Sequence, residues 1–192
     1  RRAELLRDSQ LDLDGANEAL ERAWTLKPSV ALAQMAIDLA RRRSDREGEL
    51  DWLERTLPSL EPAPKARAFV TLARLHLGLV AVGDARDVAS SPMLAPDQAE
   101  AALKQALSLA PGTADAEAML LAIYERQDRV SDVAAFYEEA AARETNGPRR
   151  AEQLLKAAAL YKDRAGRPHE AAAALLAARA SSPDDESLTA KV

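Results

Sequence analysis

The residue types that could bind a metal ion or catalyse a reaction are few in this sequence. His169 and Glu170 begin like the zinc-binding helix of a metallopeptidase, but the second histidine of that motif would fall on Ala173. With only two histidines and no cysteine, the chain also lacks the usual ligands of a structural zinc site. The spacing therefore predicts neither a catalytic nor a structural zinc site.

A faint calcium-loop pattern occurs near the N-terminus, in the run LDLDGAN. Asp12 and Asp14 precede Gly15, but the closing glutamate of a calcium-binding loop would fall on Ala23. We interpret this run as a polar turn that caps the helix after it. The sequence contains no phosphate-binding glycine loop and no nucleophile elbow, so we expect no cofactor, no metal ion and no enzymatic activity.

Three further features could bind a partner, but each has a structural explanation. Trp24 and Trp52 could anchor a ligand, yet a tryptophan on a packed helix more often belongs to the core. His76 lies on an apolar stripe, which favours a core or rim position over catalysis. The arginines of the cluster 41–46 could contact an anion, but arginine also interacts favourably with a helix C-terminus, and acidic residues follow closely.

Composition predicts an all-α protein, because alanine, the best helix former, is abundant while glycine and aromatic residues are few. The net charge of −5 and the mixed signs argue against general nucleic-acid binding, which needs a basic face. No apolar run approaches the roughly 18 residues of a membrane-spanning helix, so we expect no direct membrane insertion. The abundance of alanine and arginine favours a bacterial origin.

One helix pattern recurs along the chain: an alanine, a large apolar residue four positions on, a second alanine and then a proline. Weaker copies place Leu57 and Ala140 at the position of the second alanine, at intervals of 34 residues from Ala23 and Ala106. The three good copies are Ala16, Leu20, Ala23 and Pro28; Ala99, Leu103, Ala106 and Pro111; and Ala171, Leu175, Ala178 and Pro183.

An apolar stripe with the 3.6-residue period of a helix precedes the copies, so a first helix comes before each second helix. The prolines end the second helices, and Asn146, Gly147 and Pro148 predict the end of one helix and the start of the next. The stripes consist of Leu32, Met35, Ala36 and Leu39; Phe69, Leu72, Ala73 and His76; Leu120, Leu121 and Tyr124; and Leu154, Ala157, Ala158 and Tyr161.

This arrangement resembles the tetratricopeptide repeat (TPR) family, whose unit is two antiparallel helices in 34 residues. The resemblance implies a right-handed α-solenoid of about five antiparallel helical pairs. The family's Trp-Leu-Gly pattern on the first helix is poorly kept here. The expected single solenoid spans residues 1–192, with pairs at 1–28 (partial, with RRAELLRDSQ as its first helix), 29–62, 63–112 with an insertion at 78–96, 113–147 and 148–183, and then the start of a further helix.

The insertion makes the third pair too long for the family's unit. We expect the first helix of this pair to reach about Gly83 and the rest to form a turn-rich loop that carries Met93 and Leu94. One interpretation is a loop that contacts a partner, since insertions in repeat proteins often lie on the binding side. The other is a linker that packs against its own repeat.

In stacked helical pairs the first helices line a concave face. Some family members hold the carboxylate of chaperone tails in a clamp of basic and asparagine side chains. The resemblance aligns that clamp with Val70, Arg74, Met119, Glu152 and Lys156, which include two basic residues and no asparagine, so we do not expect it here. The exposed positions of the first helices combine apolar residues with scattered charges of both signs, which favours a partner helix or extended segment with apolar anchors. The residues that the resemblance implies for an exposed, partner-binding groove are Arg67, Val70, Thr71, Arg74, Asp115, Met119, Ala122, Glu152, Leu155 and Lys156.

The sequence therefore predicts a non-enzymatic scaffold that binds a protein or peptide partner, within a larger bacterial assembly of the motility, pilus or secretion type. The alternatives are a spacer or self-association segment of a longer repeat protein, and a regulatory domain of an enzyme outside this sequence. The start at Arg1 suggests a piece of a longer protein. The compartment stays open: the cytoplasm is favoured, and the periplasm would require a signal upstream.

Overall fold

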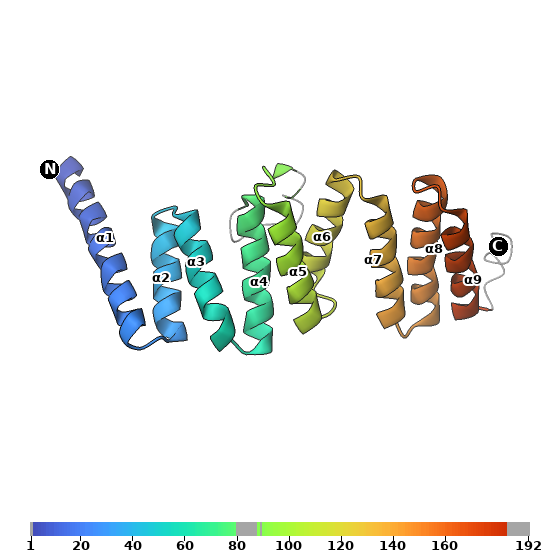
Figure 1. Cartoon of the computed structure of the whole chain (residues 1–192), viewed down its shortest axis with the longest axis horizontal. Helices are drawn as coiled ribbons and strands as arrows, with labels where there is room; N and C mark the ends of the chain where they lie inside the picture. Colours follow the sequence, from blue (N-terminus) through green and yellow to red (C-terminus); the bar gives the residue numbers. More distant parts are fainter. Residues whose placement is uncertain (1, 80–87, 89, 184–192) are drawn as a thin grey trace. The chain divides into compact units, whose positions relative to one another are not determined.

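The computed structural model describes residues 2–79, 88 and 90–183, and the side chains from residue 13 onward. Within these residues the regular structure is helical, with no strand, which confirms the predicted all-α class (Figure 1). The helices are α1 (Arg2–Leu26), α2 (Val30–Arg42), α3 (Arg46–Thr56), α4 (Pro62–Leu77), α5 (Pro96–Leu109), α6 (Ala114–Arg126), α7 (Val130–Arg143), α8 (Gly147–Asp163) and α9 (Pro168–Ser181), with a short 3₁₀ helix at Leu57–Ser59.

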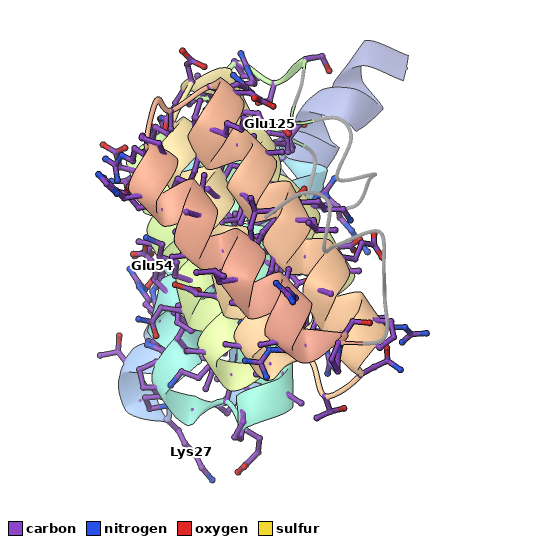
Figure 2. All side chains as sticks on the ribbon, turned by 90° about the vertical axis from the view of Figure 1, so that its right-hand side faces the viewer. Lys27, Glu54 and Glu125 are labelled. Atoms are coloured by element: carbon purple, nitrogen blue, oxygen red, sulfur yellow. The ribbon has the colours of Figure 1, made fainter. Side chains whose placement is uncertain are left out.

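The chain forms two compact units, residues 1–117 and 118–192. In the first unit, helices that follow one another in the sequence pack side by side: α1 against α2, α2 against α3, α3 against α4 and α4 against α5. Its core includes the fully buried side chains of Leu77 and Leu103. Charged side chains project away from the ribbon, as Lys27 and Glu54 do (Figure 2).

In the second unit, α7 packs against α8 and α8 packs against α9. Alanines recur in the core between these helices. One cluster joins Ala141 of α7, Ala151 and Leu154 of α8 and Ala178 of α9. A second cluster contains Ala134, Ala157, Tyr161 and Ala171.

Local capping explains where several helices begin. Ser29 and Asp45 accept hydrogen bonds from backbone N–H groups in the first turns of α2 and α3. Asn146 does the same for α8, where its carboxamide oxygen accepts from Arg149 at 3.1 Å, so the predicted helix start at Asn146-Gly147-Pro148 is confirmed. Such caps satisfy N–H groups that have no partner within the helix.

The N-terminus differs from the sequence prediction. Residues 2–26 form one continuous helix, so the polar turn expected at LDLDGAN is wrong, and so is the separate short helix before it. The physical reason is that glycine costs only about 1 kcal/mol inside a helix and no proline interrupts the run.

The end of α4 also differs from the prediction of a helix reaching about Gly83. Helix α4 ends at Leu77, because Gly78 adopts a left-handed conformation (φ +76°) and caps it. The backbone N–H groups of Met93 and Ala95 then donate to Leu77 and His76 at 3.1 and 2.8 Å. Residues 90–95 therefore pack on the end of α4, as the linker interpretation expects, whereas residues 80–87 and 89 lie outside the described residues.

Candidate functional site

The first unit contains a groove between the first helices α2 and α4, with α3 as its floor. Its volume is about 310 Å³. We call it the first-helix groove. Its lining residues are Val30, Gln34, Ile37 and Arg41 of α2; Leu53, Thr56 and Leu60 from α3 and the 3₁₀ turn; and Pro64, Arg67, Ala68 and Thr71 of α4.

The spacing of these residues explains why they share a groove. On α2 they follow one another at three- or four-residue steps, which places them on one face of a helix, and α4 repeats this spacing from Pro64 to Thr71. At the floor, the hydroxyl of Thr56 donates to the carbonyl of Trp52 at 2.6 Å, so this buried hydroxyl is satisfied within α3. The floor is therefore apolar in effect and the walls carry the polar groups.

Two arginines give the groove its charge. The guanidinium Nε of Arg41 lies 2.6 Å from the carboxylate of Glu49, whose side chain is buried, and Arg41 also lies 3.6 Å from Asp38. These acids hold Arg41 in place. Arg67 is exposed on the opposite wall, and its carbonyl accepts the hydroxyl of Thr71 at 3.1 Å. The groove thus combines aliphatic surface with a cation on each wall.

The residues that the sequence analysis placed on α4 divide into three groups. Arg67 and Thr71 line the first-helix groove, and Val70 is half-buried beside them. The expectation that Arg74 is exposed is wrong, because this residue is only 3% exposed. Arg74 lies one turn before the end of α4, where the returning chain at Met93 and Ala95 packs.

The expectation for α6 is also partly wrong. Met119 is fully buried (0% exposed), as is Ile123 one turn later. The buried stripe of α6 is therefore centred on these two residues, and the stripe inferred from the sequence was rotated toward Leu121, which is half-buried. Asp115, in the first unit, is exposed, and Ala122, in the second, is half-buried.

On α8, the predicted residues Glu152 and Lys156 form an exposed ion pair of 2.8 Å, and their hydrogen bond lowers the pKa of Glu152. The ammonium of Lys156 also lies 5.7 Å from the ring centroid of Tyr137. Leu155 is half-buried against the α7–α8–α9 cluster that contains Leu154. These polar groups thus satisfy one another on the surface of the second unit.

The loop residues separate as well. Met93 is half-buried where the chain returns to α4, and Leu94 is 55% exposed. Ser91 is buried, and its hydroxyl donates to the carbonyl of Val88 at 3.0 Å. Of these residues, Leu94 presents the apolar surface that a partner could contact.

Sequence reasoning classified the remaining candidates as structural. Trp52 is buried, which confirms the core interpretation for this residue, and it meets the half-buried Trp24 edge-on, with ring centroids 5.5 Å apart. His76 is half-buried, and burial lowers its pKa. Arg43, in the basic cluster, pairs with Asp14 of α1 at 2.7 Å.

Among the described residues, no group of three or more His, Asp or Glu side chains is arranged to hold a metal ion. In the same part of the chain, no helix combines the length and apolar character that crossing a membrane requires. Sequence reasoning missed a second apolar cleft, between α1 and α2. The apolar stripe had assigned Met35 to the core, whereas this side chain is 60% exposed and lines the cleft.

The helical pairs and their recurring second helix define the class of this protein: an all-α, TPR-like helical-repeat protein. No protein-family model and no curated protein matches the chain. Among solved structures, "Crystal structure of MamA" is similar at 18% identity over 97% of this chain and 95% of that one, with a TM-score of 0.45. A thermophilic TPR protein of Thermus thermophilus, TTC0263, has 18% identity over 99% of this chain and 93% of that one, with a TM-score of 0.38.

Proposed function

We propose that this protein is a non-enzymatic scaffold that binds a short segment of a partner protein in the first-helix groove, within a larger bacterial assembly of the motility, pilus or secretion type. The observation that carries the proposal is the groove itself, with an aliphatic floor and an arginine on each wall. Such a surface suits recognition of a peptide better than chemistry, because apolar anchors supply binding and charged groups fix orientation.

The dimensions of the groove limit the partner. From Val30 to Arg41 the α2 wall is about 17 Å long, at roughly 1.5 Å per residue. An extended segment of about five residues, at roughly 3.3 Å each, would follow its length. Val30 is 42% exposed at one end and offers an apolar contact, while Arg41 lies at the other. We therefore infer a partner segment with an aliphatic anchor and a carboxylate about a groove's length away.

Selection from a random peptide library displayed on phage tests this proposal. We expect the selected peptides to share an aliphatic residue and an Asp or Glu, and the Arg67→Glu variant to lose their binding. The matched control is Arg149→Glu, which changes an exposed arginine on another first helix, α8, and should leave binding intact. Circular dichroism would verify that both variants are folded.

A second pair of variants tests the apolar end of the groove. Val30→Glu should weaken the selected peptides, whereas Leu176→Glu, at an exposed leucine of α9, should not. Peptides that bind equally well to the wild type, Arg67→Glu and Val30→Glu would contradict the proposal. So would selection that yields no peptide sharing both features.

A further inference from the structure

A second apolar cleft, of about 480 Å³, lies between α1 and α2 in the first unit. We call it the α1–α2 cleft. Met35 stands at its surface and is 60% exposed, which is unusual for a side chain on the apolar stripe of a packed helix. The residues that line the cleft are Ala16, Ala19 and Leu20 of α1 and Met35, Asp38, Leu39 and Arg42 of α2.

The other second helices show what normally covers this surface. In α5, the equivalents Ala99, Ala102 and Leu103 are all buried, and α5 packs against its first helix, α4. In α9, Ala171 and Ala174 are buried, and Ala171 clusters with Ala157 and Tyr161 of its first helix, α8.

The same positions of α1 are open. Ala16 and Ala19 are exposed, and Leu20 is half-buried, as its equivalent Leu175 of α9 is. Helices α5 and α9 thus bury the two alanine positions, whereas within the described part of the chain no first helix covers them on α1. The α1–α2 cleft therefore has the form of a binding site for one α-helix that packs antiparallel to α1.

In the repeat pattern, the first helix that would occupy this site corresponds to residues 2–11, which we call the N-terminal arm. In the structure the arm continues the axis of α1 instead of turning back at Gly15. A straight helix cannot cover its own side, so the arm of one molecule cannot fill the cleft of the same molecule in this conformation. It can fill the cleft of a second molecule, and a twofold axis makes the exchange reciprocal.

We propose that two copies of this chain form a dimer in which the N-terminal arm of each copy occupies the α1–α2 cleft of the other. The arm's sequence suits the cleft. Its sequence contains two adjacent aliphatic residues, Leu5 and Leu6. The arm carries charges of both signs, and the cleft offers Asp38 and Arg42 to pair with them.

The oligomeric state of the 192-residue chain is the first test, measured by size-exclusion chromatography with light scattering over a range of concentrations. We expect a dimer for the wild type and a monomer for Met35→Glu, since a carboxylate in the cleft opposes burial of a helix there. Leu176→Glu is the matched control, because Leu176 is 56% exposed and lies on α9, and it should remain dimeric. A wild type that is monomeric throughout, or a Met35→Glu variant that still dimerises, overturns the proposal.

Crosslinking then identifies the segment that occupies the cleft. Because the sequence contains no cysteine, only the introduced cysteines can react. Two single variants, Leu6→Cys and Met35→Cys, are mixed and treated with a flexible bismaleimide. A crosslinked species that contains one copy of each variant supports the exchange. The double variant Leu6→Cys/Met35→Cys provides a second test. Crosslinks that form only within one chain would overturn the proposed exchange, because the arm would then fold back on its own molecule. A dimer in which the mixed pair does not crosslink also overturns it, because another surface would then hold the copies together.

Discussion

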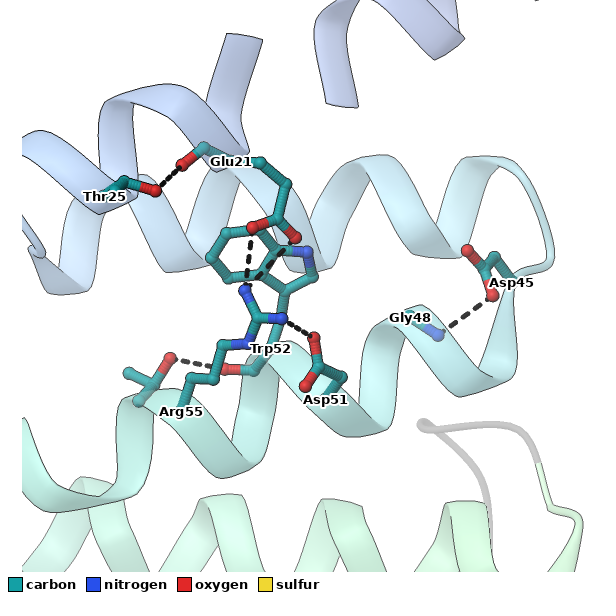
Figure 3. A network of polar contacts seen from close by, with 8 residues as sticks. Glu21, Thr25, Asp45, Gly48, Asp51, Trp52 and Arg55 are labelled. Carbon is teal, nitrogen blue, oxygen red and sulfur yellow. Dashed lines mark hydrogen bonds and ion pairs between the residues drawn. The ribbon is translucent and has the colours of Figure 1, made fainter. Parts of the chain in front are cut away.

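Two junctions of this protein join neighbouring helices in opposite ways. The junction of α1 with α3 uses large and charged side chains. Trp24 meets Trp52 edge-on. The guanidinium of Arg55 lies 4.8 Å from the Trp52 ring centroid, and Figure 3 shows Arg55 between Trp52 and Glu21. Arg55 also pairs with Glu21 of α1 at 2.9 Å and with Asp51 at 2.6 Å. The junction of α8 with α9 is built largely from alanines, and its buried large side chains are Leu154 and Tyr161 of α8.

The comparison of these two junctions shows that side-chain size sets the distance between neighbouring helices. Indole rings hold two helices apart and fill the space between them, whereas alanines let backbones approach closely. At the start of α8 the approach is so close that a Cβ on Gly147 would lie 2.3 Å from the backbone carbonyl oxygen of Ser181, at the end of α9. We therefore expect the first junction to be sensitive to lost volume and the second to added volume.

The largest effect is expected for Trp52→Ala at the aromatic junction. Trp52 is 2% exposed, and removal of a buried tryptophan leaves a cavity that lowers the free energy of unfolding by about 3–5 kcal/mol. Urea unfolding followed by circular dichroism measures this loss. Leu26→Ala, at a side chain that is 86% exposed, is the control and should change the free energy of unfolding little. Equal effects of the two substitutions would contradict the assigned role of Trp52.

The next effect is expected at the alanine junction, from Ala157→Leu. Ala157 is fully buried between α8 and its neighbours, so a leucine there overfills the contact and should cost about 1–3 kcal/mol. The matched control is Ala159→Leu, two residues on in the same helix and exposed. Thermal unfolding of both variants tests the prediction. If both variants unfold at the temperature of the wild type, close approach of the helix backbones does not determine this junction.

Tyr161→Phe examines the hydrogen bond from the Tyr161 hydroxyl to Glu138 of α7, at 3.0 Å. Loss of this bond should lower the free energy of unfolding by about 1 kcal/mol at neutral pH. Burial, together with the hydrogen bond to Glu138, raises the pKa of Tyr161 from 10.0 to about 12.

The pH dependence of Tyr161→Phe follows from that shift. Between pH 10 and 12 the unfolded chain releases the phenol proton while the folded chain keeps it, so stability contributed by Tyr161 is present below pH 10 and lost as pH rises. Urea unfolding across this range should therefore show a shallower decline for Tyr161→Phe than for the wild type. A parallel decline would contradict the assignment, and Tyr137→Phe, at a half-buried tyrosine, is the control.

The smallest effect is expected for Glu21→Gln at the aromatic junction. The hydrogen bond from Arg55 to Glu21 is the main reason that the pKa of Arg55 is raised, but both side chains are partly exposed. Exposed ion pairs contribute only about 0.2–1 kcal/mol. A double-mutant cycle with Arg55→Gln, measured at low and high salt, should give a coupling of this size that weakens with salt. Salt-independent coupling would mean that packing, not charge, joins these side chains.

Much of the fold could be predicted from the sequence. Alanine content, the 3.6-residue stripes and the Ala–Leu–Ala–Pro helix indicated paired helices, because these signals are local and act through helix propensity and periodicity. Arg67 and Thr71, which the sequence analysis placed in a groove, line the first-helix groove, and partner binding by them stays a prediction. Arg74 and Met119 were predicted to be exposed but are buried, because the burial of a residue on the edge of a stripe depends on which other parts of the chain pack there.

The helical class, the order of the helices and most of their ends follow from local sequence signals, since prolines, caps and apolar spacing act within a few residues of the position they control. Only the tertiary structure decided that α1 runs straight through Gly15, that α4 ends at Gly78, and that the surface of Ala16 and Ala19 is open while Ala99 and Ala102 are covered. The physical reason is that identical local patterns are buried or exposed according to whether a neighbouring helix reaches them, and that depends on the path of the whole chain.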